Sequence, residues 1–453
     1  MNKSKSPSLL GRFLFVTIVG FCFLLSSYTY SYASTASSAD SDIIESACQG
    51  LNIEKISEIL ASQELSEAFA ENEKDCYAWD LFIALNWPRK ANEPGLPDPK
   101  KQIGDPGAVV WEDWKTTSEV YLPQGAQPQP WGTEKEVPPE VLAKAEEMGL
   151  DTDEPFQNLG LIQQQASGLV FKSNEDNQGQ PIRYELAMNQ STFDYIFGHN
   201  PYKTGLYNIN GQETVAESCK EKIDTSAWDC IQFNWDAKEI KTSWLWLDKT
   251  NPNYEAINNT YITSNAYYQE IDNYGQPVLD SAEQPVYQVS RAALTGMHIT
   301  SKALAKWVWT TFENVNNAKY TTSTIELGIP AAAQAVNGQI QPLLQQKGTK
   351  YANYQLVGTQ IDYSDDDEPT LLANSQIESH FQRASSCITC HAFASISSQD
   401  MGEFRLSFVD TTGGNLTYYV GDIPEDTLDQ IERKEFIPLD FVWSMGLAKR
   451  HKH

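Results

Sequence analysis

The chain has 453 residues, with 60 acidic and 33 basic side chains and a formal net charge of −27 at pH 7. Such acidity repels nucleic acid and anionic lipid, and it favours a basic-surfaced partner or a saline environment, or simply maintains solubility. Hydrophobic residues make up 41% of the chain, so it can bury a large core, and its length suits about two or three domains.

The first forty residues have the pattern of a secretory signal. Three basic residues precede the apolar run Phe13–Leu25, and small residues follow it. A run of 13 residues is shorter than the ~20 needed to span a bilayer, which favours a cleaved signal over a membrane anchor. We expect residues 1–33 to form this signal, with cleavage after Ala33 or Ala36. The mature protein is then periplasmic or secreted, without stable membrane insertion, and carries a net charge of −30 because the three basic residues are lost.

Residues 40–165 are predicted to form a helical and loop-rich N-terminal region. Isoleucine and leucine recur at three- and four-residue spacing after residue 42, and a second apolar run ends at Pro88, which stops a helix. Residues 91–165 are rich in proline and glycine. We expect long loops there, with one short helix at 138–149.

Residues 166–370 are predicted to form a β-rich body. Five segments alternate in polarity or are rich in β-branched and aromatic residues, and turn residues bound them, as is typical of strands. These segments are 181–189, 238–247, 258–271, 284–300 and 306–315. The acidic stretch that ends the region, IDYSDDDEPT, is expected to be a surface loop.

The cysteine count indicates disulfide bonds. One of the seven cysteines lies in the signal, which leaves six in the mature chain. An exported protein is expected to use an even number of cysteines in bridges or cofactors. Pairing by proximity joins Cys48 with Cys76 and Cys219 with Cys230, one of the three connectivities that four cysteines allow.

The remaining two cysteines form the motif Cys387-Ile-Thr-Cys390-His391, whose chance expectation in this composition is about 0.0014. A zinc site would need two further ligands of comparable spacing, and a redox dithiol would need a βαβ context. The chain supplies neither pattern. Covalent haem fits better, because cysteines at i and i+3 share a helix face and can add to the two porphyrin vinyl groups. His391 would then be the proximal iron ligand.

The motif itself resembles the haem-attachment motif of c-type cytochromes. Four longer segments extend this resemblance along the chain. They are DLFIALNWP (80–88), RYELAMN (183–189), GMHITSKALAKWVWTTFENVNN (296–317) and ESHFQRASSCITCHAFAS (378–395). Together they resemble a family of large, exported bacterial monohaem cytochrome c proteins. The resemblance implies one covalently attached haem c and electron transfer, and it implies nothing about a substrate.

The predicted fold class is therefore α+β. A helical N-terminal segment precedes the β-rich body, and residues 371–453 form a mostly helical, cytochrome c-like haem region packed on that body. Small cytochromes c have more chain after the motif than the 62 residues that follow His391 here. We therefore expect the haem to pack against the β-rich body, which can then supply the sixth iron ligand.

Two residues are the main candidates for that ligand. His298 is a lone histidine within an apolar, strand-like segment, and Met445 lies at a spacing common for cytochrome methionines. Either residue can equally be an ordinary core residue. The other histidines and the nearest methionine are less suitable, because they are terminal, in a turn, or too close to the motif: His199, His380, Met401, His451 and His453.

Aromatic residues cluster after His298 and around the Cys-x-x-Cys-His motif. They are expected to form either part of the hydrophobic core or the apolar wall of a haem pocket. Arg383 and Arg405 are expected either to pair with haem propionates or to lie on the surface.

The function expected from the sequence is electron transfer between periplasmic redox partners. An alternative is a haem enzyme of peroxidase-like type, or a gas-responsive haem protein, in which the sixth iron site is open. A third is that the body serves as a docking module for another redox subunit. No serine–histidine–acid, phosphate-loop or dinucleotide pattern appears in the sequence.

Overall fold

The computed structural model describes most of the chain after the predicted signal. The described residues are 48, 53–61, 64–160, 170–171, 180–250, 253–272, 276–317, 329–364, 372, 386–397, 405–407, 409–410, 417–419 and 421–451. Residues Ile43–His453 form one compact unit. The predicted signal, 1–33, lies outside the described residues, as do His380, Arg383, Met401 and His453.

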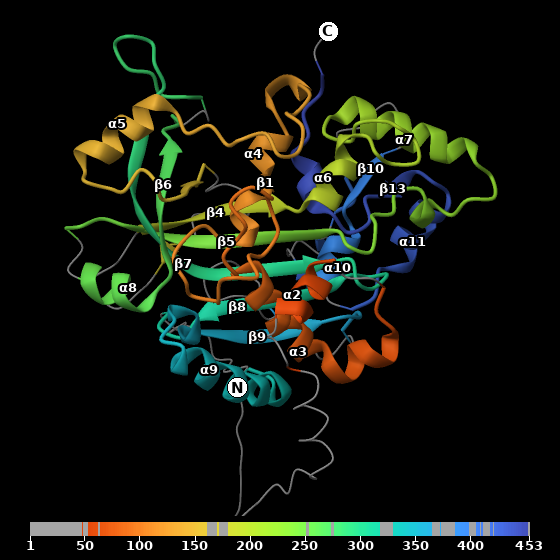
Figure 1. Cartoon of the computed structure of the whole chain (residues 1–453). Helices are drawn as coiled ribbons and strands as arrows, with labels where there is room; N and C mark the ends of the chain where they lie inside the picture. Colours follow the sequence, from red (N-terminus) through yellow and green to blue (C-terminus); the bar gives the residue numbers. More distant parts are fainter. Residues whose placement is uncertain are drawn as a thin grey trace, which may run out of the picture. The chain divides into compact units, whose positions relative to one another are not determined.

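A twisted sheet of nine described strands forms the centre of this unit (Figure 1). The strand order is β1-β4-β5-β7-β6-β2, with β3 paired to β4, β8 to β7 and β9 to β8. All pairs are antiparallel except β2 with β6. The strands are β1 Lys115–Thr116, β2 Phe156–Asn158, β3 Val170–Phe171, β4 Gln180–Met188, β5 Lys238–Leu247, β6 Thr263–Gln269, β7 Tyr287–Ser301, β8 Val308–Asn314 and β9 Tyr354–Gln360.

Helices and short strands surround the sheet. The α-helices are α2 Ile53–Leu60, α3 Glu67–Leu85, α4 Thr117–Val120, α5 Pro139–Glu147, α6 Gln190–Phe197, α7 Ile209–Glu221, α8 Tyr254–Thr260, α9 Ala331–Gln346, α10 Cys387–Ala392 and α11 Glu425–Glu432. The 3-10 helices are η1 Val110–Asp113, η2 Pro123–Gly125, η3 Ala227–Asp229, η4 Lys350–Asn353 and η6 Trp443–Leu447. The short strands are β10 Ser395–Ser397, β11 Val409–Asp410, β12 Thr417–Tyr418 and β13 Phe436–Pro438.

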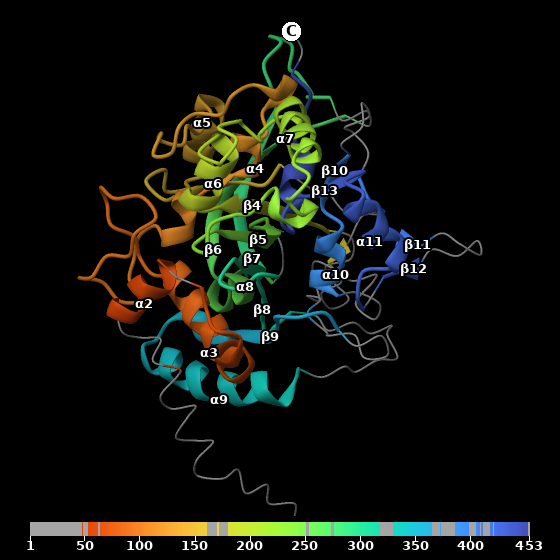
Figure 2. The ribbon, with the colours of Figure 1, turned by 90° about the vertical axis from the view of Figure 1, so that its right-hand side faces the viewer.

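The two largest apolar clusters lie on opposite faces of the sheet at β8. On one face Phe312 stacks on Phe82 of α3 with ring centroids 4.3 Å apart, and Trp79 approaches it edge-on. Trp79 also donates a hydrogen bond to Asn337 of α9, so α3 and α9 cover this face. Trp309 points to the other face, into the cluster that contains α7 and α10. In Figure 2, α3 lies on one side of the strands and α10 with α11 on the other.

The five segments predicted as strands each overlap one strand, β4 to β8. The first residues of the segment 258–271 instead belong to helix α8, and α9 and β9 were not predicted. The N-terminal periodicity corresponds to α2 and α3.

The predicted fold class is nevertheless wrong. It placed helices in an N-terminal segment and in the haem region, whereas the described helices are scattered along the chain and α6, α7, α8 and α9 interrupt the β-rich part. The described residues of 371–453 contain two short α-helices, the 3-10 helix η6 and four short strands. A mostly helical cytochrome c-like region is therefore not evident among them.

The physical reason for this error lies directly after the motif. Helix α10 ends at Ala392, and residues 395–397 pair with residues 436–438 as β10 and β13. All three residues of β10 are buried. A partner some forty residues later in the chain therefore provides the hydrogen bonds of this segment, and local periodicity does not reveal such a partner.

The two predicted cysteine pairs are close in space. The structure places the sulfur atoms of Cys48 and Cys76 at bonding distance, and likewise those of Cys219 and Cys230, with Cα–Cα distances of 5.0 and 5.8 Å. The first pair ties the chain before α2 to α3, and the second links α7 to the residue after η3.

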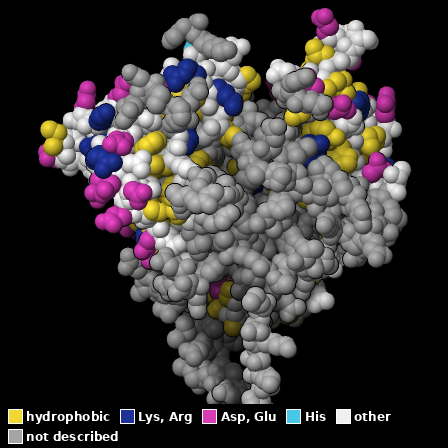
Figure 3. All heavy atoms as spheres, turned by 180° about the vertical axis from the view of Figure 1, so that it is seen from behind, with side chains coloured by type: hydrophobic (Ala, Val, Ile, Leu, Met, Phe, Trp, Pro, Cys, Tyr) yellow, Lys and Arg dark blue, Asp and Glu magenta, His cyan; other side chains and the backbone are white. Residues whose placement is uncertain are grey.

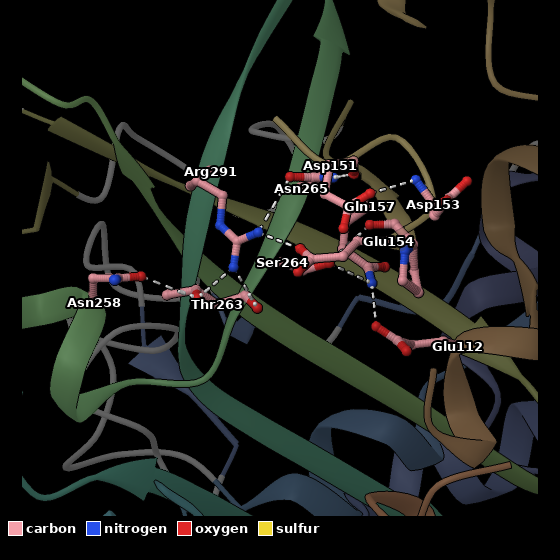
Figure 4. A network of polar contacts seen from close by, with 11 residues as sticks. Glu112, Asp151, Asp153, Glu154, Gln157, Asn258, Thr263, Ser264, Asn265 and Arg291 are labelled. Atoms are coloured by element: carbon pink, nitrogen blue, oxygen red, sulfur yellow. Dashed lines mark hydrogen bonds and ion pairs between the residues drawn. The ribbon is translucent and has the colours of Figure 1, made fainter. Parts of the chain in front are cut away.

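A polar network ties β7 to the loop before β2 (Figure 4). Arg291 of β7 donates hydrogen bonds to the side chains of Glu154 and Thr263. Nearby, Gln157 donates to Glu112 at 2.8 Å. These polar side chains supply hydrogen-bond partners for one another, as buried polar groups require, so the network is interpreted as structural.

Glu185 of β4 is a buried carboxyl whose effect on stability can be tested. Its side chain is 4% exposed, and its Oε2 has no hydrogen-bond partner among the described residues. Burial raises the pKa of this carboxyl to about 7, partly opposed by Lys135. Between pH 4.5 and 7 the carboxyl is therefore protonated in the folded protein and ionised in the unfolded chain. Because the unfolded chain binds fewer protons over this interval, the free energy of unfolding falls by about 3 kcal/mol as the pH rises from 4.5 to 7.

We expect Glu185→Gln to remove this loss. The difference in unfolding free energy between the variant and the unmodified protein should grow from pH 4.5 to 7 and stay constant above it, as measured by urea denaturation across pH. Glu147→Gln, on an exposed position of α5, is the matched control. A difference that does not change with pH would contradict the prediction.

No helix within the described ranges is long and apolar enough to cross a membrane. On the described part of one face, acidic and basic side chains are interspersed (Figure 3).

Candidate functional site

The motif cysteines lie one turn apart on helix α10. Ser386 caps this helix, because its hydroxyl accepts a hydrogen bond from the backbone N–H of Thr389 at 3.3 Å. Cys387 and Cys390 are half-buried and lie outside the two disulfide pairs. Residues at i and i+3 are neighbours on a helix surface, so α10 presents both sulfur atoms on one side.

One row of residues across the sheet underlies α10. Paired residues on neighbouring antiparallel strands share a face of the sheet. The register places four such residues side by side, one each from β5, β7, β8 and β9: Glu239, Thr300, Trp309 and Gln360.

Two members of this row contact the motif directly. Gln360 holds the beginning of α10, donating from Nε2 to Ser386 Oγ at 2.8 Å and accepting from the backbone N–H of Ile388 at 3.3 Å. The rings of Trp309 and His391 lie 4.2 Å apart between centroids. The sheet therefore contacts both the first turn of α10, through Gln360, and the ring of His391, through Trp309.

The hydrogen bond of His391 defines its tautomer. Nδ1 lies 2.7 Å from the backbone carbonyl oxygen of Phe441. A carbonyl oxygen only accepts, so Nδ1 carries the proton, and in the neutral ring Nε2 is the unprotonated nitrogen. This is the arrangement typical of a metal-binding histidine, whose second nitrogen is held by a backbone carbonyl or carboxylate.

Residues 436–445, which we call the clamp segment, hold α10 and the chain after it. Within this segment, β13 pairs with β10, and the backbone N–H of Leu439 donates to the carbonyl of Ala394 at 2.8 Å. The indole N–H of Trp443 donates to the carbonyl of Cys390 at 2.8 Å. Together with the bond to His391, these contacts fix the motif from the side of the C-terminal region.

The clamp segment is in turn attached to the sheet. The hydroxyl of Ser444 donates to Glu239 Oε1 at 2.7 Å and lies 3.2 Å from the hydroxyl of Tyr121. Burial raises the pKa of the Glu239 carboxyl to about 7, while the bond from Ser444 opposes this shift. The same row that supports α10 thus also anchors the segment that holds it.

His298 lies on the same face of the sheet as Trp309. It is half-buried on β7 and pairs with Thr311, which is two residues after Trp309 on β8. Its Nδ1 lies 2.8 Å from Thr311 Oγ1. The fold therefore brings this candidate ligand to the sheet face that carries α10.

Met445 is completely buried in the apolar cluster that also contains Ile388 and Phe393 of the motif region. It lies in η6, and its backbone carbonyl accepts from Gln212 of α7 at 3.0 Å. These contacts suit a core residue, and they leave Met445 as the alternative candidate.

Two other residues that the sequence suggested for the haem site, Arg405 and His199, make other polar contacts. Arg405 donates to the carbonyl of Ser395 and to Gln212, and burial lowers its pKa to about 10. His199 is exposed, with Nδ1 3.9 Å from Asp194. No group of three or more His, Cys, Asp or Glu side chains suited to a metal ion is found among the described residues.

Sequence reasoning did not identify the roles of Gln360, Glu239 and Phe441. The first two are single polar residues within strands, and Phe441 acts through its backbone carbonyl. No local signal distinguishes a carbonyl that will meet a histidine fifty residues earlier.

Comparisons with models of protein families, with curated proteins and with solved structures find no match for this chain.

Proposed function

We propose that this chain is an exported monohaem c-type cytochrome that binds one haem c covalently and transfers electrons between periplasmic redox partners. The observation that carries the proposal is the combination of the Cys387-x-x-Cys390-His391 spacing on α10 with the hydrogen bond from His391 Nδ1 to the Phe441 carbonyl. The spacing suits two thioether bonds, and the hydrogen bond leaves Nε2 in the form that ligates iron.

The surrounding side chains support the same chemistry. Haem c would supply a one-electron couple between ferric and ferrous iron. Cys387 and Cys390 would hold it, and His391 would be its proximal ligand. The ring of Trp309 beside His391 and the buried Ile388 and Ala392 of α10 provide apolar surroundings that exclude water and tune the reduction potential.

His298 is proposed as the distal ligand, with Met445 as the alternative. The partner is proposed to be a redox protein, and the net charge of −30 expected for the processed chain favours a basic surface on it.

The test is covalency in the unmodified protein. When the chain is produced with its signal in cells that contain haem-attachment machinery, acid–acetone extraction should leave the haem on the polypeptide. Intact mass should exceed that of the processed chain by one haem, and denaturing electrophoresis should show haem on the protein band. Complete release of haem on extraction would refute the proposal.

A further inference from the structure

The backbone that presents the Phe441 carbonyl to His391 adopts a disfavoured conformation. Asp440 and Phe441 have φ angles of 47° and 67°, in the left-handed region that residues with a Cβ atom rarely adopt. Two consecutive residues in this region persist only where the surrounding structure holds them. Their neighbours therefore show what sets the direction of this carbonyl.

Asp440 is held by a buried ion pair. Its Oδ1 lies 2.6 Å from Lys302 Nζ, and both side chains are 1% exposed. Its Oδ2 accepts from the backbone N–H of Phe233 at 2.8 Å. Lys302, which directly follows β7, also donates to the carbonyl of Ala305 at 2.8 Å.

Each charged group of the pair therefore has a further hydrogen-bond partner besides the other. Burial raises the pKa of the Asp440 carboxyl to about 6, opposed chiefly by the Lys302 ammonium, so the carboxyl is ionised at neutral pH. The ammonium also lies 5.7 and 5.8 Å from the rings of Trp235 and Trp307, which favour a cation.

We propose that Lys302 and Asp440 are positioning residues for His391: their buried ion pair fixes the left-handed turn at Asp440 and Phe441, and so aims the Phe441 carbonyl at Nδ1 of His391. This inference rests on the proposed function. Relaxation of the turn to negative φ would rotate the peptide plane and move the carbonyl away from the ring. A hydrogen bond at Nδ1 makes the imidazole a more basic ligand, which stabilises ferric iron.

The main test is the double variant Lys302→Met with Asp440→Asn. Removing both charges together avoids the large cost of leaving one of them buried and unpaired. We expect haem to remain covalently attached. The ferric–ferrous equilibrium should shift about tenfold toward the ferrous form, which is a rise of about 59 mV in a one-electron reduction potential.

A second measurement reports on the histidine itself. Exchange of the His391 Nδ1 proton with solvent, followed by nitrogen-15 NMR of the ferrous protein, should be faster in the double variant than in the unmodified protein. Lys302→Arg preserves the charge and should keep the original potential. Asp362→Asn weakens the exposed Lys306–Asp362 pair and should change neither readout.

A folded double variant with unchanged potential and unchanged proton exchange would overturn the positioning role, even if it were less stable. If the double variant does not fold, Asp440→Asn alone decides, because it removes the carboxylate while Lys302 keeps its hydrogen bond to the Ala305 carbonyl. A raised potential with faster proton exchange supports the role, and unchanged values of both overturn it. If the unmodified chain takes up no haem, the proposed function fails instead. The exchange of the His391 Nδ1 proton in the haem-free variants then still tests the ion pair.

Discussion

Replacing Cys387 and Cys390 together with serine should eliminate covalent haem attachment, from one haem per chain to none. Serine oxygen does not form the thioether bonds that join haem c to protein, and α10 presents these two sulfur atoms on one side of the helix. The change should be measured by haem staining after denaturing electrophoresis and by intact mass. The fold should persist, because the two largest apolar clusters draw residues from strands β4 to β9.

The matched control is the double variant Cys219→Ser with Cys230→Ser. It removes the same number of sulfur atoms from a pair 11 residues apart in sequence. It should retain the full haem content, while losing about 2–3 kcal/mol of stability because the bond restricts the unfolded chain. Covalent haem on the Cys387/Cys390 variant would mean that other residues attach it.

Changing His298 to alanine should open the sixth coordination position. If both axial ligands are imidazoles, the unmodified iron is six-coordinate and low-spin, and the oxidised spectrum lacks the long-wavelength band associated with thioether ligation. The variant should become high-spin and bind carbon monoxide stoichiometrically in the ferrous state, while the thioethers keep the haem attached. Visible spectra of both oxidation states, with and without carbon monoxide, measure this.

Met445→Ala is the discriminating partner variant. With His298 as ligand, it should leave the spectra nearly unchanged and reduce stability by about 2–5 kcal/mol, because Met445 is fully buried. The reverse pattern would assign Met445 as the ligand and keep the carrier function. Rapid and complete carbon monoxide binding by the unmodified ferrous protein would instead favour the haem-enzyme or gas-responsive alternative.

Five of the nine described strands of the central sheet, β4 to β8, were predictable because their signals are local. The segment 238–247 coincides with β5, and most of 306–315 lies in β8, since β-branched and aromatic residues between turn residues suit a half-buried pleated surface. The structure of residues 371–453 was not predictable in the same way. After the motif, residues 395–397 form β10 by pairing with β13, whose residues are about forty positions later in the chain.

The sequence by itself determined the chemical core of the candidate site. Cys387, Cys390 and His391 lie within five consecutive residues, so a single helical turn brings them together whatever the remainder of the chain does. Their spacing and the secretory signal pattern are properties of the covalent chain, and both could be read before any fold was known.

Only the tertiary structure decided how this core is oriented. The carbonyl that holds His391 belongs to Phe441, the ring beside it to Trp309, and the cap of its helix is held by Gln360. These groups come from segments 26 to 82 residues away from the residues that they contact. They converge because strand register places residues of several strands in one row, and because a buried ion pair holds a turn that its own sequence disfavours. Both effects depend on non-local pairing, for which the sequence around the motif carries no signal.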